Sequence, residues 1–64
     1  MKLTKEDNPF GVQVRQKWRP KDGRREFVIS QIEKCLNGIF AVADYGGAHR
    51  MINLLGFDRY TRVK

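Results

Sequence analysis

Residues 37–47 read Asn-Gly-Ile-Phe-Ala-Val-Ala-Asp-Tyr-Gly-Gly, and this stretch decides the predicted fold. Asn-Gly at its start and Gly-Gly at its end are dipeptides typical of tight hairpin turns, because these residues tolerate positive φ. The segment between them, residues 39–45, has the apolar and β-branched content of a strand. Phe40 and Val42 are expected to face the core, because the opposite face is mostly alanine. One strand between two hairpin turns predicts an antiparallel meander.

Two more strands are predicted upstream. Residues 25–32 are rich in β-branched residues, and their apolar centre indicates burial on both faces or a bulge. A Pro-Lys-Asp-Gly turn at 20–23 separates them from residues 12–18, where apolar and polar residues alternate with the period of a half-buried strand. The alternative is a short helix over residues 29–36, where the apolar residues also have helical spacing.

Downstream, residues 49–54 are predicted to form a fourth strand. Residues 54–60 are apolar with a central glycine, which fits a single 3₁₀ turn better than an α-helix. Residues 61–63 then supply a short closing strand. Turn and strand signals together predict an all-β domain over residues 10–64, preceded by a flexible segment at 1–9.

This order of elements resembles the SH3-like barrels. The resemblance covers residues 10–63 and rests on Val12-Gln13-Val14, Gly38, Gly46-Gly47 and Phe57-Asp58-Arg59-Tyr60. These features look like barrel modules of the Tudor, KOW and retroviral integrase C-terminal type. The resemblance implies a single small five-stranded SH3-like barrel with a one-turn 3₁₀ helix before the last strand. It is a resemblance of architecture, and architecture alone does not fix function.

A chain of 64 residues can form one domain at most, with a small core. The apolar residues expected to supply most of that core are Val12, Val14, Phe27, Ile29, Phe40, Val42, Ile52, Leu54 and Phe57. Cys35 is the only cysteine and His49 the only histidine, which excludes an internal disulfide and a Cys/His zinc site. We expect no cofactor and no catalytic residues, because no nucleophile, base or phosphate loop forms a constellation.

The net charge of +6 predicts a polyanionic partner. The polar start of the chain lacks the apolar run of a signal peptide, and no stretch approaches the length of a membrane span. A cytoplasmic protein without membrane contact is therefore expected.

The positive charge is concentrated between residues 15 and 25, where six cations face one acidic residue, Asp22. Such a patch can neutralise phosphates and bind a DNA or RNA backbone without reading its sequence. Aromatic rings among the cations provide stacking surfaces for bases, although in so small a domain Trp18 is better explained as core. The predicted nucleic-acid-binding residues are Arg15, Lys17, Trp18, Arg19, Lys21, Arg24, Arg25, Tyr45 and Arg50, with Arg59 and Arg62 extending the patch.

Two alternatives stay open at this point. The first is a protein–protein interaction module that binds an acidic surface of its partner, or a small phage- or plasmid-type regulator that binds a host protein. A strand edge could serve this role or make a homo-oligomer. The second is an enzyme that builds its site around a shared pore, as plasmid-borne dihydrofolate reductases do. Residues 50–54 do not match the pore strand of those enzymes, so an enzyme is not expected.

Overall fold

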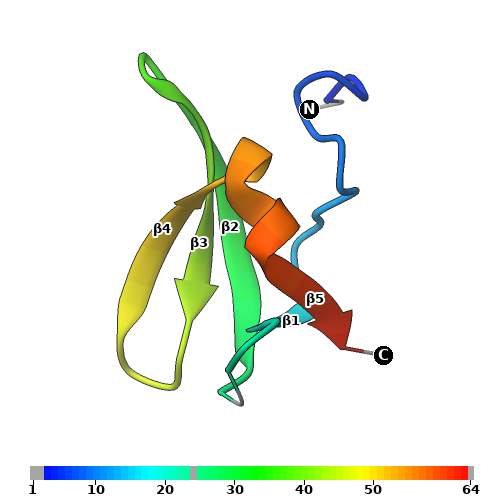
Figure 1. Cartoon of the computed structure of the whole chain (residues 1–64). Coiled ribbons are helices and arrows are strands. Elements are labelled where there is room, and N and C mark those ends of the chain that lie inside the picture. The colour runs from blue at the N-terminus through cyan, green and yellow to red at the C-terminus, as the bar shows by residue number, and fades with distance from the viewer. Residues whose placement is uncertain (1–2, 24, 64) are drawn as a thin grey trace.

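Short strands joined by tight turns fold into one antiparallel sheet in the computed structural model, which describes residues 3–23 and 25–63 (Figure 1). Along the chain the elements are β1 (Lys17–Pro20), β2 (Phe27–Cys35), β3 (Gly38–Asp44), β4 (His49–Asn53), the 3₁₀ helix η1 (Leu54–Arg59) and β5 (Tyr60–Val63). The strand order in the sheet is β4-β3-β2-β1-β5. The predicted all-β class, with a 3₁₀ turn before the last strand, is confirmed. Closure into an SH3-like barrel stays a prediction, because β4 and β5 form the two edges of this sheet.

Both predicted hairpin turns are present. β2 and β3 are joined by a two-residue loop at 36–37, and Gly38 pairs as the first residue of β3 with φ of 133°. β3 and β4 are joined around the glycines at 46–47, which have φ of 80° and 123°. The N–H of Tyr45 donates to the carbonyl of Ala48 at 2.9 Å and closes this second turn.

The turn at 20–23 is also confirmed, since the N–H of Gly23 donates to the carbonyl of Pro20 at 3.2 Å. Gly23 is not among the glycines with positive φ. The turn places β1 and β2 side by side, with Lys17 opposite Val28 and Trp18 opposite Phe27.

The apolar centre of β2 contains the predicted bulge. Ile29 pairs with Ala43, and the next pair along the ladder is Gln31 with Val42, so the register shifts between them. The helix considered for residues 29–36 is wrong, because this segment forms a ladder with β3 that continues to the hairpin loop. Tertiary pairing overrides the helical spacing of its apolar residues.

The strand predicted over residues 12–18 is wrong for most of its length, since β1 begins only at Lys17. The side chain of Asn8 forms two hydrogen bonds with the backbone of Val12: its Nδ2 donates to the Val12 carbonyl, and its Oδ1 accepts from the Val12 N–H, each at 2.9 Å. Arg15 has φ of 77°, a left-handed conformation that breaks an extended chain. The alternating pattern therefore belongs to a folded loop that returns to β2.

The predicted flexible segment at 1–9 begins with two residues outside the described range. From residue 3 onward it makes a turn in which the N–H of Asn8 donates to the Thr4 carbonyl at 2.9 Å. Leu3 packs against the core cluster. The hydrogen-bonded turn thus leads the chain to Asn8 and the loop that Asn8 fixes.

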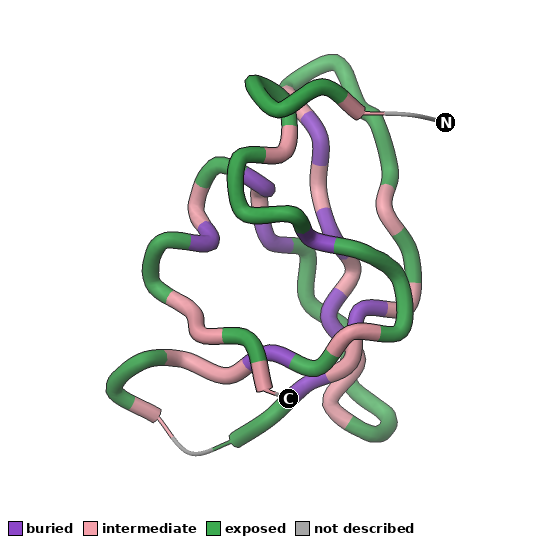
Figure 2. The backbone as a smooth tube through the Cα atoms, turned by 90° about the vertical axis from the view of Figure 1, so that its right-hand side faces the viewer, coloured by how far each residue is buried: buried purple, intermediate pink, exposed green. Residues whose placement is uncertain are grey.

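The core is built around aromatic rings, and buried positions gather inside the turns of the chain (Figure 2). The rings of Trp18 and Phe57 meet edge to face with centroids 5.0 Å apart. The buried residues are Val12, Trp18, Phe27, Ile29, Ile39, Ala41, Ala43, Ile52, Leu54 and Phe57.

The inward face of β3 was predicted wrongly. Ala41 and Ala43 are fully buried, whereas Phe40 and Val42 are only half-buried on the other face. The physical reason is volume: large rings from β1, β2 and η1 fill the core, and small side chains on β3 leave room for them. Val14 is also outside the core, with 48% of its surface exposed, because it lies in the loop before β1.

Candidate nucleic-acid interface

The basic stretch between residues 15 and 25 does not form one patch. Arg15 and Lys17 lie beside β5, whereas Arg25 reaches Tyr45 at the β3–β4 turn. Arg24 lies outside the described residues. The sequence therefore identified the basic segment, but the fold places its described residues on separate surfaces.

Arg15 and Lys17 line a shallow concavity beside β5, together with Arg62. Its volume is about 490 Å³. The remaining lining residues are Val14, Gln16 and Val63. Among the described residues, three cations and no acidic side chain line this surface, which we call the basic concavity.

Pairing between β1 and β5 brings two distant segments of the chain together at the basic concavity. β1 pairs with β5 so that Lys17 is opposite Val63 and Trp18 is opposite Arg62. Opposed residues share a face of the sheet, so Arg62 is on the face of Trp18 and Lys17 is on the other face. Both residues line the basic concavity at this end of the β1–β5 ladder, although 45 positions separate them in the sequence. Sequence analysis named Arg62 only as an extension of the patch, since it could not give this register.

The loop before β1 is fixed by Gln16, a residue that the sequence did not single out. Its Oε1 accepts from the Gln13 N–H at 2.8 Å and from the indole Nε1 of Trp18 at 3.1 Å. The N–H of Arg15 donates to the Ile29 carbonyl at 2.7 Å, and the Gln16 carbonyl accepts from the Ile29 N–H at 2.9 Å. Arg15 is thus held against β2 with its side chain exposed. A glutamine two residues before a buried tryptophan is too common a pattern to have revealed this role.

Trp18 does not offer a stacking surface. Only 5% of its surface is exposed, its ring packs on Phe57, and its indole N–H is bound to Gln16. A nucleobase could reach the ring only if the core opened. The prediction of base stacking on Trp18 is therefore wrong, and its alternative interpretation as a core residue is confirmed.

Tyr45 and Arg25 are engaged with each other. The guanidinium carbon of Arg25 lies 5.2 Å from the centroid of the Tyr45 ring, a cation–π arrangement. Its Nη2 also donates to the Tyr45 carbonyl at 3.1 Å. Phe27 contacts the same ring, with centroids 5.2 Å apart. None of these three residues lines the basic concavity.

Arg19 lies in β1 and Lys21 in the turn that follows it, and neither residue lines the basic concavity. Arg19 Nη1 donates to the Gly23 carbonyl at 3.4 Å. Lys21 is exposed, and its N–H donates to the Arg59 carbonyl at 3.0 Å. They place positive charge at the end of β1 without joining the three clustered cations.

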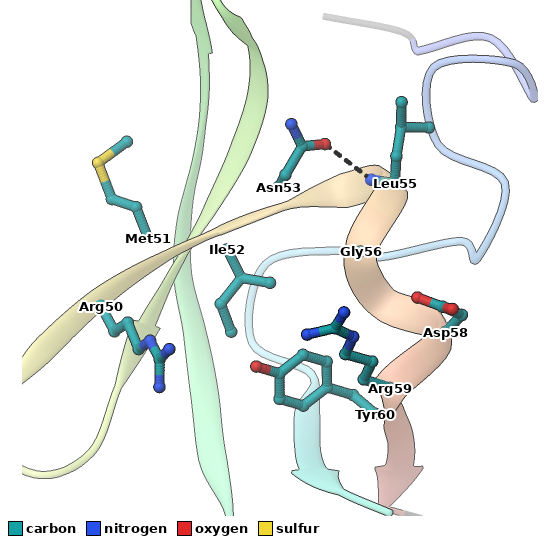
Figure 3. Close-up of a pocket in the computed structure, with 9 residues that line it drawn as sticks. All are labelled: Arg50, Met51, Ile52, Asn53, Leu55, Gly56, Asp58, Arg59 and Tyr60. Carbon is teal, nitrogen blue, oxygen red and sulfur yellow. Dashed lines mark hydrogen bonds between the residues drawn. The ribbon is translucent and has the colours of Figure 1, made fainter.

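Arg50 and Arg59 line a second hollow of about 440 Å³ between β4 and η1 (Figure 3). Ile52 and Tyr60 also line it, and so does one acidic residue, Asp58. We call this hollow the edge groove. It is separate from the basic concavity, so the predicted site residue Arg50 is not part of the same surface as Arg15.

Within the described residues, no group of three or more His, Cys, Asp or Glu side chains could hold a metal ion. Cys35 and His49 are both exposed, at the end of β2 and the start of β4. No helix among residues 3–23 and 25–63 is long and apolar enough to cross a membrane. Comparison with protein-family models, curated proteins and solved structures finds no match.

Proposed function

We propose that the protein binds the sugar–phosphate backbone of a nucleic acid through the basic concavity. The observation that carries this proposal is that Arg15, Lys17 and Arg62, from two segments of the chain, line one hollow at which residues 3–23 and 25–63 place no acidic side chain. Cations without acidic neighbours attract phosphates and release the counterions that surround them. The net charge of +6 adds long-range attraction for a polyanion.

The two arginines suit this task in particular. A guanidinium group presents a planar fork of donors that matches two phosphate oxygens, while the ammonium group of Lys17 acts as a point charge. Arg15 is held by a backbone hydrogen bond at its own N–H, so its starting position is fixed before binding. Less backbone freedom is then lost on binding.

Binding through the basic concavity is expected to be blind to sequence. The ring of Trp18 is buried, and the ring of Tyr45 is packed against Phe27 and Arg25. Among the described residues, no aromatic ring lines the basic concavity, so bases have no stacking surface there, and phosphate contacts alone carry no sequence information. DNA and RNA of any sequence should therefore bind with similar affinity at equal salt.

The test is a titration by fluorescence anisotropy against single-stranded DNA, single-stranded RNA and duplex DNA over a series of salt concentrations. Three phosphate contacts predict a slope of log affinity against log salt of roughly −2 to −3. The double variant Arg15→Gln/Arg62→Gln should reduce the magnitude of that slope by about 1 to 2.

Arg25→Gln is the matched control, because it removes one exposed arginine outside the basic concavity. It should leave the slope within error of the unmodified protein. An equal loss per arginine from Arg25→Gln and from Arg15→Gln/Arg62→Gln would mean that only net charge matters, and the basic concavity would not be a site. Affinity independent of salt would contradict phosphate binding altogether.

A further inference from the structure

β4 is a regular strand at the edge of the sheet. It pairs with β3 over five consecutive residues without a shift in register, from Asp44 opposite His49 to Phe40 opposite Asn53. Among the described residues no strand pairs with its other side. Three devices that often protect an edge, namely proline, lysine and a bulge, are absent from the sequence and register of this strand, whose one arginine is Arg50.

The direction of the free backbone groups follows from the hairpin. The N–H of Tyr45 bonds to Ala48, so this pair is hydrogen-bonded, and such pairs alternate with non-bonded ones along an antiparallel ladder. Arg50 and Ile52 therefore bond to β3. His49 and Met51 direct their N–H and C=O groups away from β3, toward the open edge. A row of unpaired groups at this spacing is a template for one more strand.

The edge groove adds chemical character to this template. Ile52 and Tyr60 form an apolar part of the groove between β4 and η1, and Arg50 and Arg59 carry its positive charge, whereas Met51 and Leu55 point away from it (Figure 3). Asp58 is the single acidic lining residue. The volume of about 440 Å³ falls within the range of ordinary ligand sites, roughly 300–1,000 Å³.

The opposite side of β4 carries one apolar residue, Met51, between His49 and Asn53. Met51 projects to the other side of the strand from Ile52, and 49% of its surface is exposed (Figure 3). An added strand would place alternate side chains on these two sides. One set would face Arg50 and Arg59, and the other would lie along Met51.

We infer that the β4 edge binds an extended, acidic segment of a partner protein, in which acidic and apolar residues alternate. The acidic side chains pair with Arg50 and Arg59, and the apolar ones cover Met51. A second copy of the chain is disfavoured as the occupant, because it brings another net charge of +6 and its own arginines to the same edge. This site is independent of the basic concavity, since the two share no lining residue.

The test uses a blocked peptide of alternating glutamate and valine with the full protein, followed by NMR of backbone amides. Peptide addition should shift the amide signals of residues 49–53 and slow the hydrogen exchange of the Met51 N–H. Two control peptides separate the contributions. Methylation of alternate peptide nitrogens removes the donors of a paired strand and should abolish protection, and glutamine in place of glutamate should weaken binding through lost charge.

Protein variants test the same two contributions. Met51→Pro removes the outward N–H at an edge position that tolerates proline, and binding should be lost. Met51→Ala keeps that N–H and should still protect the residue 51 amide. Arg50→Gln and Arg59→Gln should each weaken binding about two- to fivefold, the range of an exposed ion pair. If Met51→Pro does not fold, the methylated peptide still decides whether backbone pairing occurs.

The nucleic-acid variants make the two proposals separable. Arg15→Gln/Arg62→Gln should leave peptide binding unchanged, and Arg50→Gln/Arg59→Gln should retain most of the salt slope with DNA. Peptide-induced shifts at β5 or the basic concavity instead of β4 would overturn the inference. Protection of the Met51 N–H that rises with protein concentration in the absence of peptide would identify a second copy as the occupant and also overturn it.

Discussion

The two edges of the sheet differ in what they offer a partner. At β5, the pairing with β1 gathers side-chain charge, and Arg62 joins Arg15 and Lys17 around the basic concavity. At β4, the regular pairing with β3 leaves unpaired backbone groups beside the edge groove, which two arginines line. One edge is suited to a charged backbone of any sequence, and the other to a segment of defined alternation. Register thus creates two different surfaces from similar short strands.

Both edges depend on η1, because β4 ends where it begins and β5 starts where it ends. Leu54 and Phe57 anchor it, with no exposed surface on either side chain. The carbonyl of Phe57 accepts the N–H of Tyr60, which sets the start of β5. A change in η1 should therefore affect both edges together.

The largest effect is expected from Phe57→Ala. Loss of a buried phenylalanine costs about 3–5 kcal/mol. A domain of this size has a total stability of only about 3–10 kcal/mol. The variant should be largely unfolded or close to it, and should bind neither DNA nor peptide.

Urea denaturation followed by tryptophan fluorescence measures this change, because Trp18 contacts Phe57 directly. Phe57→Leu is the control, since it keeps an apolar side chain and should lose less. A Phe57→Ala protein that retains one edge function would show that the edges do not share η1 as their support.

The second-largest effect is expected from Gln16→Ala, which should change binding at the β5 edge but not at the β4 edge. It leaves the Trp18 indole N–H without its partner in a part-buried position, which costs about 1–3 kcal/mol. It also releases the Gln13 N–H and loosens the loop that holds Arg15. DNA affinity should therefore fall together with stability.

Gln16→Glu separates these two effects. A carboxylate can accept both hydrogen bonds, so the free energy of unfolding in urea should stay near that of the unmodified protein. Its negative charge between Arg15 and Lys17 should still lower the magnitude of the salt slope by about 1. A normal slope for Gln16→Glu would place the phosphates elsewhere.

Asn53→Ala tests the junction between β4 and η1. The Oδ1 of Asn53 accepts the Leu55 N–H at 2.9 Å, and losing such a cap costs typically about 1 kcal/mol. In a domain of this size that lowers the melting temperature by roughly 4–8 °C. Thermal unfolding by circular dichroism measures it, and Asn53→Asp, which keeps the acceptor, should melt near the unmodified protein. Equal melting of all three proteins would show that the cap contributes nothing.

Sequence reasoning succeeded where local chemistry decides the structure. The hairpin glycines, the turn at 20–23 and the 3₁₀ segment were predicted because each depends on a few adjacent residues. The start of the first strand was not predicted, because it is set by the Asn8 side chain and by the positive φ of Arg15. Alternation in sequence cannot reveal a hydrogen bond that crosses a loop.

The residues of the candidate site were likewise predicted only in part. Composition and charge order in the sequence identified Arg15 and Lys17, but pairing between β1 and β5 decided that Arg62 joins them and Arg25 does not. The inward face of β3 was missed for a related reason. Alanines such as Ala41 face inward because rings from other elements already fill the core, and no property of β3 alone records that volume.

The smallest effect concerns the other end of β4, where Asp44 shapes the turn that starts the strand. Its Oδ1 accepts the N–H of Gly46 at 2.8 Å and lies 3.5 Å from the N–H of Gly47. These bonds favour the charged form and hold the pKa of Asp44 below its ordinary value. Because the folded pKa is lowered, the carboxylate stabilises the fold above the ordinary aspartate pKa of about 3.9, and this contribution is lost as pH falls toward the lower folded value.

Asp44→Asn isolates that contribution from the other carboxylates, because it keeps an oxygen acceptor for Gly46 but does not titrate. Urea unfolding over a series of acidic pH values should show a smaller decline in stability for the variant than for the unmodified protein. Protection of the His49 and Met51 amides against hydrogen exchange should likewise decline less in the variant. Protection of the β1–β5 pairs should decline equally in both proteins. If acid loosened β5 as much as β4 in this difference, the turn would not be a local support, and the two edges would be coupled through more than η1.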